Sequence, residues 1–408
     1  MNFTEIAALV ILVMTYAGVA IGRIPGLRLD RAGIALLGAA AMIAVGALSL
    51  DDAYKVVDWN TLTLLLGMMI VVAHLKVSGA FRTVGALAMK HAHAPFVLLA
   101  TVTLMSGVLS AFLVNDAICL VMAPIVVQIT RALNRNPAPY LVATATASNC
   151  GSVGTITGNP QNMVIGAISG VSYPAFSAAL APVALVSLVL VVVIVRLVYR
   201  EEFRKPSAEV DGAPFRGVIH KRQMLKAIFV CVALGVAFFA GMAPARAALY
   251  GGAFLLLTRA IKPHRIYREI DGPLLILFAG LFVVVAGAER VLLTPQMVSA
   301  VASAGLGEVW RLSALTAIAS NIVSNVPAVL ALRPFVSALH DPAKAWLVVA
   351  MSSTLAGNFT LLGSVANLIV AEQAARANAP ISFGSYFRVG APLTLLTLVI
   401  GTAWLARG

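Results

Sequence analysis

The residue with the most distinctive chemistry is a solitary carboxylate, Asp116, in an otherwise apolar part of the chain. The stretches 94–130 and 138–170 contain no other acidic residue. If these segments lie in a membrane, a carboxylate among them is costly and usually marks a function. Burial favours the neutral acid, so we predict that Asp116 gains and loses protons as a coupling residue. The alternative is a structural acceptor for backbone N–H groups at a chain turn.

Asparagine, serine and threonine side chains gather in the same segments and in two later ones. They flank runs of small residues where a helix would break and leave backbone groups without partners. Amide and hydroxyl groups either satisfy that backbone, which is the simpler interpretation, or turn toward a ligand as donors and acceptors. The predicted substrate-binding residues are Ser110, Asn115, Ser148, Asn149, Ser152, Asn162, Asn321, Asn325, Thr354, Asn358 and Asn367.

Charge and motif content narrow the chemistry of this site. Basic residues are absent from 94–130, 138–170, 312–332 and 345–375. An anion there would depend on amides and helix N-termini alone, whereas a small neutral polyhydroxyl solute fits more naturally. The sequence lacks a zinc-binding H-E-x-x-H, a G-x-S-x-G elbow and a Walker A loop. We therefore expect no enzyme, no cofactor and no metal site.

Apolar segments that could carry these residues recur along the whole chain. Of its 408 residues, 60% are hydrophobic and 11% are charged, which is more apolar than a water-soluble fold requires. A membrane-spanning helix takes about 20 apolar residues. We predict an all-α polytopic membrane protein whose first helix is retained. The clearest spans are 3–22, 32–49, 60–75, 174–195, 224–241, 272–288 and 386–405.

Basic residues predict the orientation of the chain. In a membrane protein, the net charge of +13 indicates topology and anionic lipid rather than nucleic acid. The stretch 200–226 holds seven basic residues against four acids, so we expect it to be cytoplasmic, in a multi-pass inner-membrane protein with both termini external. This trace requires 94–130 to enter and leave on the cytoplasmic side, as a re-entrant hairpin buried in protein.

Internal similarity indicates that the arrangement occurs twice. The run from Ser110 to Asp116 aligns with the run from Ser320 to Val326. Further matches place Leu66-Gly67-Met68 against Ala279-Gly280-Leu281 and Gly158…Asn162 against Gly363…Asn367. An odd number of crossings per half inverts the second copy. Inverted repeats with broken helices are typical of secondary transporters that work by alternating access, with a passive channel as the competing class.

The predicted boundaries follow from the repeat and the basic linker. The first inverted repeat is 1–199 and the second is 223–408, joined by a cytoplasmic linker at 200–222. Within the repeats we expect scaffold helices at 1–93 and 223–311, a re-entrant hairpin with a broken transmembrane helix at 94–170 and 312–376, and closing helices at 174–199 and 386–406.

At these residues the sequence resembles the ion-transporter superfamily, and within it the arsenical-pump membrane protein family. The resemblance covers essentially the whole chain. It departs at Cys150, where a small or apolar residue is expected. It rests on Phe112-Leu-Val-Asn115-Asp116 with Pro124, on Ala147-Ser148-Asn149-Cys-Gly151-Ser152 with Gly158-Asn159-Pro160-Gln161-Asn162, and on Ser320-Asn321-Ile-Val-Ser324-Asn325-Val-Pro327.

The resemblance implies export of arsenite or antimonite in exchange for protons. It also implies scaffold and transport regions in each protomer, a homodimer formed through the scaffold and, in some relatives, a soluble arsenic-stimulated ATPase as partner. The same architecture serves carboxylate, sulfate and sodium transporters. A proton- or sodium-coupled small-anion transporter is therefore the alternative.

Overall fold

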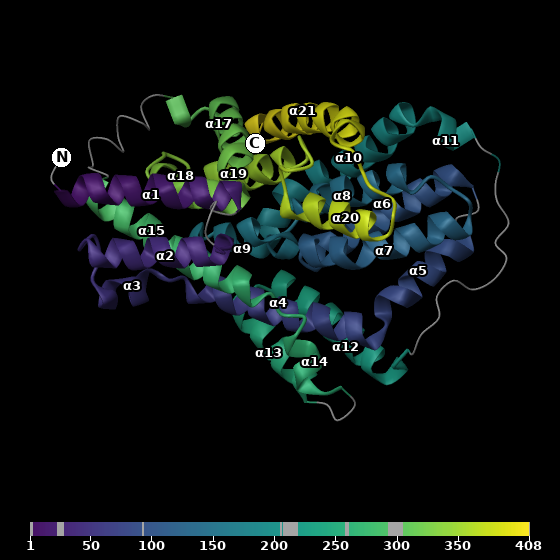
Figure 1. Ribbon diagram of the computed structural model, residues 1–408, viewed down its shortest axis with the longest axis horizontal. Coiled ribbons are helices and arrows are strands. Elements are labelled where there is room, and N and C mark those ends of the chain that lie inside the picture. The colour runs from purple at the N-terminus through teal and green to yellow at the C-terminus, as the bar shows by residue number, and fades with distance from the viewer. Residues whose placement is uncertain are drawn as a thin grey trace.

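The computed structural model describes residues 3–22, 28–91, 94–204, 206, 219–257, 261–292 and 305–407. All regular structure in these ranges is helical, and eight of the described helices are long and apolar enough to cross a membrane (Figure 1). The prediction of an all-α polytopic membrane protein is confirmed. Much of the predicted linker 200–222 and part of the predicted scaffold segment 223–311 lie outside the described residues.

The first half begins with helices that form part of the scaffold and ends with a hairpin, a broken helix and a closing helix. The hairpin is α6 and α7, the broken helix is α8, the short η1 and α9, and α10 closes the half. The bounds are α1 (Phe3–Ile21), α2 (Arg31–Ala44), α3 (Leu50–Val56), α4 (Trp59–Ser78), α5 (Ala80–His91), α6 (Pro95–Phe112), α7 (Asn115–Ala132), α8 (Pro137–Ser152), η1 (Ile156–Gly158), α9 (Pro160–Ile168) and α10 (Tyr173–Val198).

The second half repeats this order after the short α11. Its scaffold helices are α12 to α15, its hairpin is α17 and α18, its broken helix is α19 and α20, and α21 closes it. The bounds are α11 (Arg200–Arg204), α12 (Lys221–Phe239), α13 (Pro244–Leu256), α14 (Pro263–Tyr267), α15 (Gly272–Leu292), α17 (Val309–Val323), α18 (Asn325–Val336), α19 (Pro342–Ala356), α20 (Val365–Arg376) and α21 (Phe383–Arg407).

The two halves are intertwined by reciprocal contacts between scaffold helices. A Cβ atom at Gly67 of α4 would lie 2.6 Å from the carbonyl carbon of Ala248 in α13. At the matched position, a Cβ at Gly280 of α15 would lie 2.7 Å from that of Ala35 in α2. Small residues allow backbones to approach this closely in membrane helix pairs. Helix α4 of the first half therefore pairs with α13 of the second half, and α15 of the second half pairs with α2 of the first half. This reciprocity is consistent with two inverted repeats.

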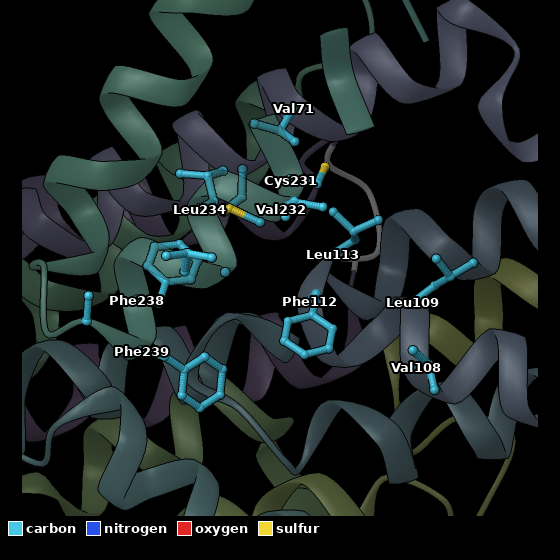
Figure 2. Close-up of a pocket in the computed structure, with 14 residues that line it drawn as sticks. Val71, Val108, Leu109, Phe112, Leu113, Cys231, Val232, Leu234, Phe238 and Phe239 are labelled. Carbon is cyan, nitrogen blue, oxygen red and sulfur yellow. The ribbon is translucent and has the colours of Figure 1, made fainter. Parts of the chain in front are cut away.

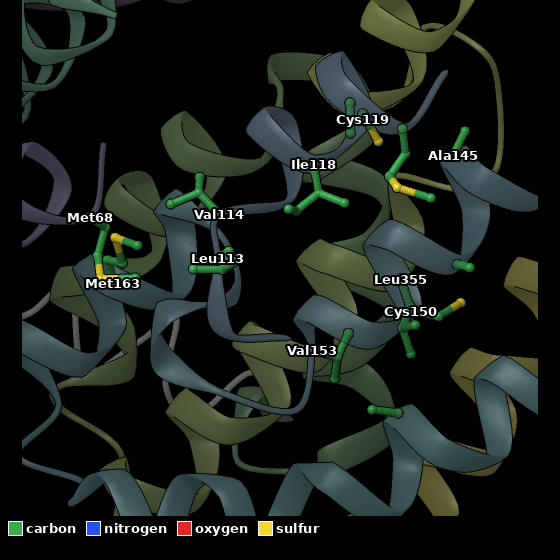
Figure 3. Close-up of a cluster of buried hydrophobic side chains, with 14 of the residues drawn as sticks. Met68, Leu113, Val114, Ile118, Cys119, Ala145, Cys150, Val153, Met163 and Leu355 are labelled. Carbon is green, nitrogen blue, oxygen red and sulfur yellow. The ribbon is translucent and has the colours of Figure 1, made fainter. Parts of the chain in front are cut away.

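The scaffold pairs lie along one side of the molecule in Figure 1, with α1, α2 and α15 at the left and α4, α12 and α13 below. The first hairpin, α6 and α7, lies toward the right of the view together with α8 and α20, and the second hairpin, α17 and α18, lies above α1 at the upper left. Apolar packing fixes the tip of the first hairpin: Leu113, Val114, Ile118 and Val153 are all buried (Figure 3). The tip is thus held by the core of its own half.

The runs of small residues predict helix breaks at 148–152 and 352–358, and the structure breaks both helices later, the first by about one turn. The small residues at 148–152 remain helical in α8, and those at 352–356 remain helical in α19. Small side chains are needed in α8 because Gly151 packs directly on the backbone of Gly107 in α6. The first break falls at 153–159, and α9 then starts where Asn159 accepts from the backbone N–H of Asn162 (2.9 Å) and Pro160 takes the first helical position.

The second predicted span, 32–49, is also shorter in the structure. Helix α2 ends at Ala44, because Gly46 turns the chain with a φ of 74° and Ser49 caps the short α3 through the backbone N–H of Asp52 (3.1 Å). The apolar residues after Ala44 therefore belong to a connection rather than to a span.

Candidate functional site

The N-terminal ends of four helices meet around one small polar cavity between the two hairpin tips. The helices are α7, α9, α18 and α20, and the scaffold helices α1, α2 and α15 close the other side. The free N–H groups and the positive dipole end of each helix attract oxygen atoms of a ligand. The cavity measures about 60 Å³, and its polar lining is Arg31, Asn115, Asp116, Gln161, Ser324, Asn325 and Ser364.

A larger cavity of about 750 Å³ lies between α4, α6 and α12 and differs in chemistry (Figure 2). Phe112, Phe238 and Phe239 face it together with aliphatic side chains, and the thiol of Cys231 is its most polar lining group. The side chains of this cavity offer a solute only the weak hydrogen bonds of sulfur. We therefore place the candidate site in the smaller polar cavity.

Matched asparagines bridge the two helix breaks in the same way. The Nδ2 of Asn162 donates to the carbonyl oxygens of Ser152 and Thr155, at 3.0 and 2.9 Å. The Nδ2 of Asn367 donates to the two corresponding carbonyls of the second break, at 2.8 and 3.1 Å. Both residues are fully buried. They satisfy carbonyls that the interrupted helices leave without partners.

A directed chain of amide hydrogen bonds runs from the second break to the first hairpin tip. Because backbone carbonyls hold the Nδ2 of Asn367, its Oδ1 is left to accept from Asn149 Nδ2 (3.0 Å). Asn149 Nδ2 also donates to Asn358 Oδ1 (2.8 Å). Asn149 Oδ1 in turn accepts from Asn115 Nδ2 (3.0 Å). The Oδ1 of Asn115 is then left as a buried acceptor, and Asn115 is only 3% exposed.

That last oxygen has no hydrogen-bond partner among the described residues, and neither does Oδ1 of Asn162. The orientation of each amide is fixed by the bonds its nitrogen makes, so both are acceptors. A buried acceptor without a donor costs free energy, about 1–3 kcal/mol. Asn115 borders the cavity, so a donor group on a bound solute would satisfy it.

Reciprocal hydrogen bonds join the halves beside this chain. Asn159 Nδ2 donates to Thr354 Oγ1 (3.2 Å), and Ser364 Oγ, at the matched place in the second half, donates to Asn149 Oδ1 (3.2 Å). Cys150, the position that departs from the family pattern, accepts from Asn358 Nδ2 (3.3 Å). Its sulfur belongs to the buried network and does not border the cavity.

The hairpin tips are tied to the broken helices by serine hydroxyls. In the first half, Ser110 Oγ donates to Ser148 Oγ (3.0 Å), which donates to the carbonyl oxygen of Asn115 (3.2 Å). In the second half, Ser320 Oγ bonds both to Asn325 Oδ1 (2.6 Å) and to the carbonyl oxygen of residue 353 (3.0 Å). The second tip turns at Ser324, whose φ of 76° is strained for a non-glycine residue.

Three of the predicted site residues border the cavity, namely Asn115, Asp116 and Asn325. Asn321 is exposed on α17, and its Nδ2 donates to the carbonyls of Ala317 and Ala356 (3.0 and 3.1 Å). The other predicted residues build the network beneath the cavity. These are Ser110, Ser148, Asn149, Ser152, Asn162, Thr354, Asn358 and Asn367.

Four polar lining residues were not among the predicted ligands. Gln161 and Ser324 stand inside the motif runs, and Ser364 matches Asn159 in the repeat, so local signals for them existed. Arg31 is different, because it lies far from every interrupted segment and reaches the cavity from α2. The absence of basic residues from the interrupted segments therefore does not make the cavity free of positive charge.

Inverted repeats with two hairpins around a polar cavity define a secondary transporter of the ion-transporter superfamily. The sequence model of the citrate transporter family, CitMHS, matches residues 9–346. The chain therefore belongs to that family, which is a family of transporters. The superfamily predicted from the motifs is confirmed, and the narrower arsenical-pump assignment stays a prediction.

Curated relatives cover nearly the whole chain. An uncharacterized transporter of Mycobacterium tuberculosis is 30% identical over 98% of both chains. The silicon efflux transporter LSI3 of Oryza sativa is 29% identical over 93% of each, and a putative transporter arsB of Dictyostelium discoideum is 24% identical over 92% of this chain and 87% of its own. The crystal structure of the Alcanivorax borkumensis YdaH transporter shares the fold, with a TM-score of 0.62 at 14% identity over 100% and 98% of the chains.

Proposed function

We propose that this transporter exports a small, neutral, polyhydroxylated metalloid acid, arsenite or antimonite, in exchange for protons. The observation that carries the proposal is the size of the polar cavity, about 60 Å³. One water molecule needs about 10–15 Å³ on this measure, so the cavity takes a solute of about four to six non-hydrogen atoms. Arsenous acid, a central atom with three hydroxyl groups, is of that size, whereas citrate is much larger.

The hydrogen-bonding pattern of the cavity supports the same substrate class. Asn115 Oδ1 is a buried acceptor that lacks a donor among the described residues. Arsenous acid is uncharged at neutral pH, and its hydroxyl groups both donate and accept. A fully ionised dianion would bring only acceptors to this oxygen and would need its charges offset in a low-dielectric setting.

The names of two relatives agree with this substrate class. One is a silicon efflux transporter and another is a putative transporter named arsB. Silicon dissolves as an acid that is likewise small, neutral and polyhydroxylated.

Arg31 favours a second candidate, a proton- or sodium-coupled transporter of a small anion. Its guanidinium reaches the cavity and would supply the positive charge that a carboxylate or sulfate needs. The family description, citrate transporter, names a carboxylate substrate. The cavity would then have to widen to accept an anion of that size.

Transport by everted membrane vesicles separates the two candidates. Vesicles energised to be acidic inside should accumulate arsenite, and a protonophore should collapse that uptake. Citrate, sulfate and small dicarboxylates, each with and without a sodium gradient, serve as comparison substrates. Vesicles that ignore arsenite and accumulate one of these anions would establish the second candidate.

We further propose that the protein lies in the inner membrane with both termini external and with 131–136 and 200–222 in the cytoplasm. The basic residues of 200–226 support this orientation. Single cysteines in 131–136 and 340–344 should react with an impermeant reagent from the cytoplasmic and the external side, respectively. Reaction of 131–136 from outside would reverse the orientation. The homodimer and the ATPase partner stay predictions.

A further inference from the structure

Residues of opposite charge, from two different parts of the fold, line the same polar cavity. Asp116 lies in the first turn of α7, at the tip of the hairpin, and is half-buried. Arg31 is the first residue of α2, a scaffold helix, and is also half-buried. Both side chains line the cavity, and each acts electrostatically on the other.

Few other charges act on the Asp116 carboxyl group. The acidic side chain of Asp271, just before α15, has a larger effect on it than Arg31 has. The helices α6 and α8, which pack against α7, carry no charged residue, whereas α5, which also packs against α7, carries Arg82, Lys90 and His91. The thiol of Cys119 lies on the same helix as Asp116. The two charged residues of α20, Glu372 and Arg376, pair with each other (2.6 Å) in the last turns of α20.

Arg31 has a second neighbour that offers a purely structural explanation. Its guanidinium packs beside Gly22, the residue that follows the end of α1. A cation at that place favourably faces the negative end of the helix dipole. Arg31 also lines the cavity, and no hydrogen bond or ion pair to another described residue is found for it.

We propose that Arg31 is the scaffold counter-charge of Asp116, holding the deprotonated hairpin tip against α2 and releasing the tip when Asp116 is protonated. The inference rests on the proton coupling of the proposed function, to which it adds the residue that responds to the protonation state of Asp116. Alternating access requires the hairpins to shift against the scaffold around the site. Arg31 attracts the Asp116 carboxyl group only when that group is deprotonated. Protonation removes this attraction, so the shift of the hairpin is coupled to the protonation of Asp116.

The proposal makes a prediction that needs no substrate. Val365 borders the cavity. In a Val365→Cys variant, the rate at which the cysteine is labelled reports how far the hairpin tip has moved from α2. Ala375, exposed on the same helix and away from the cavity, provides the matched Ala375→Cys control for ionisation of the thiol itself. Protein without either introduced cysteine corrects for Cys119, Cys150 and Cys231. The ratio of the two labelling rates should change with pH around a midpoint set by Asp116.

Arg31→Gln should move that midpoint upward by about one pH unit or more, because a carboxyl group that loses a nearby cation holds its proton to higher pH. Arg31→Lys keeps the charge and should move it less. Asp116→Asn should make the ratio independent of pH, and adding Arg31→Gln to Asp116→Asn should change nothing further. These results would be expected whichever substrate is carried.

Two results would overturn the proposal. One is an unchanged midpoint in well-folded Arg31→Gln protein, which would leave Arg31 as a cap of α1 or a ligand of an anionic substrate. The other is a further change when Arg31→Gln is combined with Asp116→Asn. Failure to transport arsenite would overturn the substrate assignment and leave this test unaffected, so the two failures are distinguishable.

Discussion

The two halves of the site share a framework and differ in the groups that face the cavity. In both, a buried asparagine, Asn162 or Asn367, closes the helix break by donating to two carbonyls. At the hairpin tips the halves diverge: Asp116 is matched by Val326, and the free acceptor of Asn115 is matched by Asn325, whose Oδ1 accepts from a serine. The framework is required by the interrupted backbone, so it appears twice. At the tips, the ionisable group and the unpaired acceptor belong to the first half alone, so we propose that they serve coupling and binding.

The framework depends most on Asn149, so Asn149→Ala should have the largest effect. Its removal leaves buried groups of Asn115, Asn358 and Asn367 without partners. At roughly 1–3 kcal/mol for each buried group, the loss of stability should be about 3 kcal/mol or more. The melting temperature in detergent measures it, and Asn60→Ala, at an exposed residue, is the matched control. Equal melting temperatures for the two variants would show that the chain of amides is not structural.

The two broken helices should differ in their tolerance of a methyl group. Gly151 packs on the backbone of Gly107, and an alanine there would clash with its carbonyl oxygen. The matched residue in the second half is already alanine, Ala356. We expect Gly151→Ala to destabilise the protein by about 1–3 kcal/mol and Ala356→Gly by about 1 kcal/mol or less. A larger cost for Ala356→Gly would mean that the second half is the more tightly packed one.

The hairpin tips should contribute unequally to affinity. Asn115→Ala removes the free acceptor, whereas Asn325→Ala removes an amide already bonded to Ser320. One hydrogen bond is worth about 0.5–1.5 kcal/mol, so KM for arsenite should rise about 2- to 12-fold in Asn115→Ala and less in Asn325→Ala. Initial transport rates across a range of arsenite concentrations give both values. A greater rise for Asn325→Ala would place the substrate against the second tip.

Local sequence patterns were sufficient to predict the helices, the repeat and the hairpins. Asn115, Asp116 and Asn325 could be assigned to the cavity because they stand at the tips of matched interrupted segments. The sequence could not show which asparagines face a ligand and which face each other, since that depends on contacts between residues about 200 positions apart, such as Asn149 with Asn367. Arg31 was missed for the same reason: its place in the site follows from packing of α2 and carries no local signal.

The central claim is that the first half alone carries the proton, through Asp116. Proteoliposomes with an internal pH indicator test it most directly, because an imposed arsenite gradient should drive protons in the opposite direction. Asp116→Asn is nearly isosteric and should abolish this proton movement while arsenite–arsenite exchange continues. Proton movement coupled to arsenite in the Asp116→Asn protein would contradict the account and make Asp116 a structural residue.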